Sequence, residues 1–319
     1  MSNLGVHVYY LENNLSWEFE KICVSFLSAM SWKKYMGPIH LYCNKNYLEI
    51  LKKWGVDKIY DKIDTTVLEN LPLEIDYKQY WAYSKLFVIQ TLKSDAPFTI
   101  LDCDLWLSDK IRIDTNLDCT MYHYENYDGE SANTYYPDFD FLVPDEIIKL
   151  NFDKSLLPTN CALLHINNPT FIDDWIDLAN RIAIHNKDIK ADNNSIKMIL
   201  IEQRLLPMYL SKMNYKYGTF INTIYQGQFA FSQDGSNWKP KLSEMTPEEL
   251  LDTKKIKHLW GYKRFFPNHE KRNLIMKELI NRINELEVDK NNWFPLLYEL
   301  EANYSSTYEK KNKEMFFNF

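Results

Sequence analysis

The sequence predicts an α/β fold in which helices flank a β-sheet. Two observations support this class. Apolar, strand-like runs alternate with helix-like segments over the first 60 residues, which is the pattern of βαβ units. Hydrophobic residues make up 45% and aromatic residues 15% of the 319 residues, which is enough to build a large folded core.

The first part of the chain contains three expected strands and two expected helices. In chain order these are a strand at residues 4–10, a helix from about residue 16, a strand at 39–43, a helix at 47–54 and a strand at 56–60. Glu18 and Glu20 fall in the first turn of the first helix, where the helix dipole favours acidic side chains. Gly55 is expected to end the second helix. Strands and helices that alternate at such short intervals predict a parallel sheet with helices on its faces.

After residue 110 the alternation of strand-like and helix-like segments becomes less regular. Before that point, a helix is expected at 77–92 and a strand that ends at Asp102. After it, strands are expected at 118–125, 159–166 and 255–260. Helices are expected at 171–185 and 195–206, from a helix start at Thr246, and from residue 268 onward. We expect residues 1–264 to form one domain. Residues 265–319 are expected to form a helical C-terminal extension packed on it.

Charge and cysteine content restrict the class of protein. The formal net charge is -7 and the pI is about 5.6, which argues against nucleic acid as a partner. The five cysteines show no Cys-x-x-Cys spacing, and no His/Cys cluster has the spacing of a zinc site. No signal-peptide pattern or transmembrane segment is found, so we expect a cytoplasmic protein.

Asp102 and Asp104 are the first candidate functional residues. The apolar run at 98–101 stops at these two carboxylates, which only Cys103 separates. In an extended segment alternate side chains point the same way, so both carboxylates would face one side. Two buried carboxylates repel each other unless a cation lies between them, and Mn²⁺ or Mg²⁺ would supply that charge. The alternative is an acidic turn where a strand meets solvent.

A second candidate segment is found near the end of the predicted domain. His258 lies near the end of the strand expected at 255–260, Gly261 follows three residues later, and Lys263 and Arg264 are adjacent cations. Imidazole can complete a metal site alongside carboxylates, and glycine allows close approach of the backbone to a ligand. Lysine or arginine can bind a diphosphate. A surface strand end with solvated charges is the alternative.

Together these segments resemble the motifs of metal-dependent GT-A glycosyltransferases. The chain is similar to the retaining group that includes glycogenin and bacterial lipopolysaccharide transferases. Asp102-Cys103-Asp104 matches the D-x-D motif of that group, and the segment from His258 to Arg264 matches its H-x-x-G-x-x-K motif. Arg264 stands at the final lysine position and Lys263 precedes it, so the resemblance leaves open which cation meets the diphosphate. It implies a GT-A type, Rossmann-like mixed sheet flanked by helices, with residues 1–264 as the nucleotide-sugar-binding catalytic domain.

Further residues are assigned roles by the same resemblance. Asn160 begins a segment that resembles the stretch lining the sugar pocket, although Ala162 replaces its glycine. Glu202 and Gln203 resemble the element that meets the donor sugar or the reaction centre, and Lys85 stands where a basic residue could touch the donor diphosphate. Their alternatives are a strand-start turn for Asn160 and solvated helix faces for Glu202 and Lys85. Tyr9 could border the nucleotide base or pack in the core.

The resemblance implies a hexosyltransferase that uses Mn²⁺ or Mg²⁺ and a nucleotide diphosphate sugar, expected to be UDP-linked. The expected acceptor is a saccharide or a lipid-linked molecule, as in polysaccharide biosynthesis, and the expected stereochemistry is retention. The amphipathic C-terminal helices and the cationic, aromatic tail at 310–319 could contact a membrane surface or simply pack in the fold. Two other functions stay open: a sugar nucleotidyltransferase, and a non-catalytic protein that binds nucleotide sugars with a transferase-like fold.

Overall fold

The structure, a computed structural model, confirms the α/β class. It describes residues 3–11, 16–72, 74–77, 79–126, 139–189, 195–221, 224–226, 239–240, 255–258, 266–287, 296–297 and 299–300. The chain divides into two compact units. Unit 1 comprises Met1–Thr66, Asp102–Ile111 and Lys254–Phe319, and unit 2 comprises Val67–Leu101 and Arg112–Thr253.

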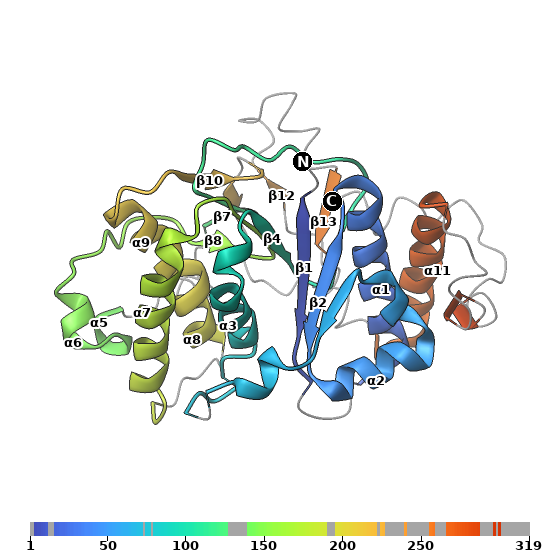
Figure 1. The fold of residues 1–319 in the computed structure, drawn as a ribbon, viewed down its shortest axis with the longest axis horizontal. Coiled ribbons are helices and arrows are strands. Elements are labelled where there is room, and N and C mark those ends of the chain that lie inside the picture. Colours follow the sequence, from blue (N-terminus) through green and yellow to red (C-terminus); the bar gives the residue numbers. More distant parts are fainter. Residues whose placement is uncertain are drawn as a thin grey trace. The chain divides into compact units, whose positions relative to one another are not determined.

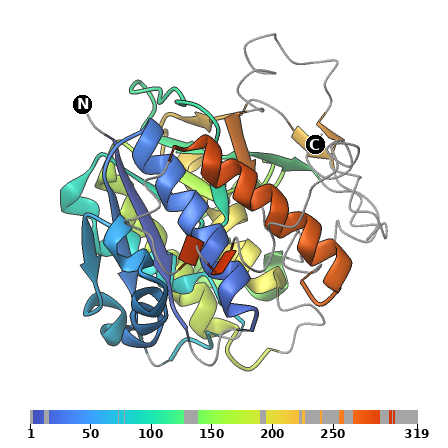
Figure 2. The same ribbon diagram turned by 90° about the vertical axis from the view of Figure 1, so that its right-hand side faces the viewer.

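In its described residues, unit 1 combines a parallel sheet with a two-stranded antiparallel ribbon and flanking helices (Figure 1). Its strands are β1 (Leu4–Tyr9), β2 (Ile39–Cys43), β3 (Lys62–Asp64), β5 (Leu105–Leu107) and β13 (Ile256–His258), and its helices are α1 (Glu18–Tyr35), α2 (Lys45–Trp54) and α11 (His269–Glu285). The strands β1, β2 and β3 pair in parallel in that order, and β5 pairs with β13. In Figure 2, α11 runs alongside α1, and the two helices contact each other.

The ends of α1 and α2 follow from local chemistry. Glu18 and Glu20 lie in the first turn of α1, and lysines occupy its last turn, as the helix dipole favours. The side chain of Asn44 caps α2 by accepting a hydrogen bond from the backbone N–H of Tyr47. Gly55 ends α2 at φ 72°, a left-handed conformation that costs glycine little.

Unit 2 contains two sheets of mixed direction. Its strands are β4 (Phe98–Leu101), β6 (Cys119–Met121), β7 (His123–Asn126), β8 (Thr159–Asn160), β9 (Leu163–Ile166), β10 (Tyr217–Thr219), β11 (Ile224–Gln226) and β12 (Lys239–Pro240). One sheet has the order β10-β6-β9-β4 and the other β12-β11-β7-β8. The helices are α3 (Tyr83–Thr91), α5 (Phe139–Leu142), α6 (Asp145–Ile148), α7 (Ile172–His185), α8 (Ser195–Ile199) and α9 (Leu205–Lys212). The expected mixed sheet and flanking helices are therefore confirmed.

Several expected elements differ from the structure. The strand expected at 56–60 is a 3₁₀ helix, Val56–Ile59, and the strand begins later, as β3. The helix expected from residue 77 begins at Tyr83. The strands expected at 118–125 and 159–166 are each divided between the two sheets, because the backbone changes partner near Tyr122 and Cys161. A π-helical turn, Leu200–Arg204, interrupts the helix expected at 195–206.

The C-terminal part is described only in pieces. The expected helix after residue 268 is confirmed as α11, whereas the helix start at Thr246 and the tail at 310–319 lie outside the described residues. The expected domain boundary between residues 264 and 265 stays a prediction. Among the described residues, no helix combines the length and the apolar character needed to cross a membrane.

Gly5 provides a test of the packing in unit 1. A Cβ added at this position would lie 2.3–2.6 Å from three atoms of the Trp32 indole, which is fully buried. We predict that Gly5→Ala lowers the free energy of unfolding by about 1–3 kcal/mol, because the ring has no free space into which to move. Urea unfolding measures the change. Gly218→Ala is the control, since its nearest neighbour is the flexible end of Leu117, and equal losses would contradict the prediction.

His165 provides a test of pH dependence in unit 2. Burial lowers its pKa to about 4, and its Nδ1 lies 2.9 Å from Thr99 Oγ1 on the neighbouring strand. The unfolded chain therefore binds a proton more readily, so this contribution to stability is present above about pH 6.5 and is lost as the pH falls toward 4. We predict that His165→Asn makes the stability curve flatter between these pH values. Parallel curves for the two proteins, measured by urea unfolding, would contradict this.

Candidate functional site

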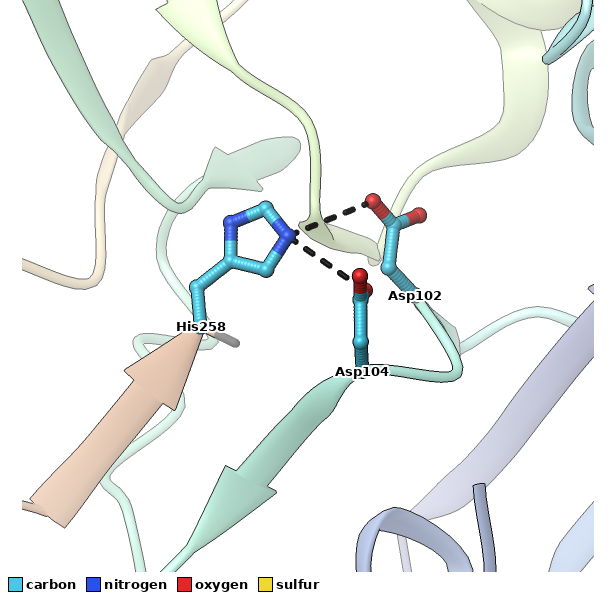
Figure 3. Close-up of side chains that lie close together, drawn as sticks. All are labelled: Asp102, Asp104 and His258. Carbon is cyan, nitrogen blue, oxygen red and sulfur yellow. Dashed lines mark ion pairs between the residues drawn. The ribbon is translucent and has the colours of Figure 1, made fainter. Parts of the chain in front are cut away.

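Asp102 and Asp104 lie in a tight turn that leads into β5. The backbone N–H of Leu105 donates a 3.0 Å hydrogen bond to Asp102 O, which closes the turn. The extended conformation expected for this segment is therefore wrong. Both carboxylates nevertheless point toward the same neighbour, which Figure 3 identifies as His258.

Strand pairing brings His258 to the two carboxylates. The register of the β5–β13 ribbon sets His258 opposite Leu105, the residue that follows Asp104. Its Nε2 lies 3.4 Å from Asp104 Oδ1 and 3.8 Å from Asp102 Oδ2 (Figure 3). One ligand atom from each residue lies within 4.8 Å of the other two. All three residues belong to unit 1, so the expected convergence of these motifs is found within one compact body.

The three side chains fit a hard divalent cation. Ligands held at about 2.1 Å by an octahedral ion lie about 3.0 Å apart when adjacent and about 4.2 Å apart when opposite. The observed 3.4 and 3.8 Å fall between these values. Asp104 is buried and His258 is 12% exposed, whereas the side chain of Asp102 is 35% exposed, which leaves a path for a ligand to reach the group. Two carboxylates and one imidazole form a donor set that suits Mn²⁺ or Mg²⁺.

The remaining residues of the second motif cannot be placed. Gly261, Lys263 and Arg264 lie outside the described residues, which stop at His258 in this segment. Tyr9, also in unit 1, stacks on the buried ring of Tyr47 with ring centroids 3.9 Å apart. One face of Tyr9 is therefore used in packing, as the core interpretation expects, and the residue is only half-buried.

A buried polar cluster in unit 2 contains the other candidate residues. Lys85 Nζ forms an ion pair with Glu202 Oε1 at 2.5 Å and donates a 3.1 Å hydrogen bond to the carbonyl of Cys161. Both charged side chains are less than 10% exposed. The solvated helix faces considered for Lys85 and Glu202 are therefore wrong. The cost of burying these charges is offset by their pairing.

Glu202 and Gln203 lie on the π-helical turn Leu200–Arg204. Such turns widen a helix locally and are frequent at functional sites. The buried Oε1 of Gln203 has no hydrogen-bond partner in the described part of the chain. Because a buried polar group without a partner is costly, this amide is suited to binding a ligand.

Asn160 makes protein contacts at both ends of its amide. Its Nδ2 donates a 2.8 Å hydrogen bond to Glu125 Oε1, and its Oδ1 accepts one of 2.9 Å from the backbone N–H of Ala162. Glu125 is completely buried, and the sequence analysis missed it. The available signal was a carboxylate at the end of a run of mostly apolar and aromatic residues, where a buried charge is unfavourable unless it has a partner.

Comparisons with known proteins identify a family and several similar structures. Residues 10–258 match the model of a family described as "Family of unknown function (DUF6734)". No curated protein matches the sequence.

Three similar solved structures are glycosyltransferases by name. "PaToxG Glycosyltransferase" is 12% identical over 66% of this chain and 69% of its own, with a TM-score of 0.38. Mouse xyloside xylosyltransferase 1 is 10% identical over 67% and 84%, with a TM-score of 0.36. The bifunctional enzyme WbbM is 11% identical over 96% of this chain and 52% of its own, with a TM-score of 0.46. These values are too low to transfer an activity to this chain.

The Lys85–Glu202 pair can be tested by a double-mutant cycle. We predict that Lys85→Met and Glu202→Gln each lower the free energy of unfolding by about 3–5 kcal/mol, because each leaves a buried group without its partner. The double variant should lose clearly less than the sum of the two. The exposed pair Lys93–Asp173 in the same unit is the control, with an expected coupling of about 0.2–1 kcal/mol. Additive losses at Lys85 and Glu202, measured by urea unfolding, would disprove a strong interaction.

Proposed function

The chain belongs to the family of unknown function DUF6734, and we propose that it is a metal-dependent glycosyltransferase of GT-A type. It would transfer a hexose from a nucleotide diphosphate sugar, UDP-linked, to a saccharide or lipid-linked acceptor. One observation carries the proposal: Asp102, Asp104 and His258 converge although more than 150 residues separate the turn from the histidine. A solvated acidic turn would not require a partner from so distant a strand.

In this proposal Asp102, Asp104 and His258 hold Mn²⁺ or Mg²⁺. Such an ion would act as a Lewis acid, offsetting the negative charge that develops on the departing nucleoside diphosphate. Lys263 or Arg264 would bind the same diphosphate by charge-assisted hydrogen bonds, and Gly261 would let the backbone approach it. The burial of Asp104 and His258 strengthens their interaction with any bound charge, because the surrounding protein screens it less than water does.

The cluster in unit 2 supplies the remaining proposed roles. Gln203 would use its amide oxygen, which has no partner among the described residues, to accept a hydrogen bond from a donor-sugar hydroxyl. Glu202 would lie beside it near the reaction centre, with retention as the outcome. Lys85 would orient Glu202 through their ion pair and meet the donor diphosphate. Asn160 would line the sugar pocket and Tyr9 would border the base. Rigid mutual contacts suit residues that must hold a sugar in one orientation.

We first predict that ligand binding stabilises the folded protein. In thermal unfolding with a panel of nucleotide sugars, UDP-hexoses together with Mn²⁺ should raise the melting temperature. A ligand at 100 times its dissociation constant contributes about 2.7 kcal/mol at 25 °C by mass action. UDP-hexoses with EDTA in place of Mn²⁺ should give little or no shift. A shift that is equal with and without metal would contradict metal-dependent binding.

Replacement of Asp104 tests the metal centre directly. We predict that Asp104→Asn weakens Mn²⁺ binding by about 100-fold or more and abolishes release of UDP from UDP-hexose, because it removes one ligand charge. Asp109→Asn is the matched control, since Asp109 lies on the same segment but is exposed. Isothermal titration and product analysis report both effects. Full activity of Asp104→Asn would end this assignment, and release of pyrophosphate in place of UDP would indicate a nucleotidyltransferase.

A further inference from the structure

We propose that His7, Ser28 and Tyr60 form a buried hydrogen-bond chain that positions the Asp102–Leu105 turn for cation binding. The inference rests on the proposed metal-dependent function and adds three positioning residues to it. All of them belong to unit 1, as does the turn. None of them is a ligand in the proposed metal centre.

The contacts form one continuous path. Tyr60 Oη lies 3.0 Å from His7 Nδ1, and His7 Nε2 lies 3.0 Å from Ser28 Oγ. The hydroxyl of Ser28 donates to Leu105 O and lies 3.4 Å from Asp102 O. These two carbonyls bracket Asp104, so a single hydroxyl holds both ends of the turn that carries the metal ligands.

The direction of every hydrogen bond from Tyr60 to the turn follows from Ser28, the last residue of the hydrogen-bond chain. A carbonyl can only accept, so the single hydrogen of Ser28 is committed to the turn. Ser28 Oγ must then accept from His7, which places the imidazole hydrogen on Nε2. The neutral ring has Nδ1 left as an acceptor, and the hydroxyl of Tyr60 donates to it. One tautomer of His7 therefore satisfies the whole chain.

Burial keeps this arrangement fixed. His7 and Ser28 are completely buried and Tyr60 is 7% exposed. Burial lowers the pKa of His7 to about 3, so the ring stays neutral near pH 7. A buried polar group that loses its partner has no water to replace it, so each member constrains the next.

A second serine of α1 fixes the strand that follows the turn. Ser31, one helical turn after Ser28, accepts a 3.0 Å hydrogen bond from the backbone N–H of Leu107 in β5. Its own hydroxyl donates to Ser28 O at 2.9 Å. Helix α1 thus holds the backbone of Leu105 and Leu107 on either side of Trp106. Groups that orient metal ligands in this way commonly affect metal affinity 10–100-fold.

The protein contains a second serine that serves as a matched control for Ser28. Ser25 is a buried serine on the same helix, and its hydroxyl lies 3.2 Å from Tyr47 Oη rather than on the turn. Ser28→Ala and Ser25→Ala each remove one buried hydroxyl, so each also costs stability. Only Ser28→Ala removes a hydrogen bond to the segment that carries Asp102 and Asp104.

The experiment compares Mn²⁺ affinity and thermal stability of the full-length variants, with free Mn²⁺ measured by electron paramagnetic resonance. We expect Ser28→Ala and His7→Phe to weaken Mn²⁺ binding at least tenfold and Ser25→Ala to change it less than twofold. His7→Gln should restore most of the affinity relative to His7→Phe, because its amide nitrogen can replace Nε2 as the donor to Ser28. His7→Asn, whose shorter amide corresponds to Nδ1, should not.

The outcomes separate this inference from the proposed function. Equal Mn²⁺ affinities of Ser28→Ala and Ser25→Ala, with Asp104→Asn still defective, would overturn the positioning role and leave the metal centre intact. No Mn²⁺ binding by the unmodified protein, or equal binding by Asp104→Asn, would overturn the proposed function itself. If Ser28→Ala does not fold, the comparison of His7→Gln with His7→Phe decides the same question.

Discussion

The convergence of two carboxylates on one imidazole is the constraint on which the candidate site depends. Asp102 and Asp104 stand at the two ends of a three-residue segment, and their charges repel each other when both are ionised. The antiparallel ribbon of β5 and β13 brings His258 to them by setting it opposite Leu105, and in the proposed site a cation held by the three side chains would offset the repulsion. A slip of that register by one residue would turn His258 to the other face and break the cluster. The chemistry of the site therefore depends on one short pairing of strands.

Helix α1 supports this ribbon through hydrogen bonds from serine side chains, which are unusual in the interior of a helix. Ser28 and Ser31 lie in the middle of α1, where their hydroxyls bind backbone groups of β5 and the turn before it. Serine contributes little to helix stability on its own. Its presence at two buried positions facing the same short strand is best explained by the polar backbone that it satisfies. The turn that carries Asp102 and Asp104, the strand β5 and the helix α1 are parts of one hydrogen-bonded assembly.

Much of the architecture could be predicted from the sequence, and the failures have physical causes. The C-terminal end of α2 was predicted because Gly55 acts through local chemistry, whereas the helix begins at Lys45, after its cap Asn44, and not at the expected residue 47. The division of one apolar run between β6 and β7 was not, since alternation describes which residues face a sheet but not which sheet they join. That His258 lies close to Asp104 was predictable only because the two residues belong to two motifs that occur together in the glycosyltransferases the sequence resembles. His7 and Glu125 gave no periodic signal, because their importance lies in partners distant in the sequence.

The wide separation of His258 from Asp102 and Asp104 along the chain also bears on how this family can vary. The whole of residues 112–253 connects β5 to the segment that carries β13. The entropy of closing such a connection grows only with the logarithm of its length, and doubling it costs about 0.6 kcal/mol. Flexible surface loops added in this region would therefore alter the free energy of assembling the ribbon very little. Such loops are free to diversify while the geometry of Asp102, Asp104 and His258 and the folded core of unit 2 stay constant.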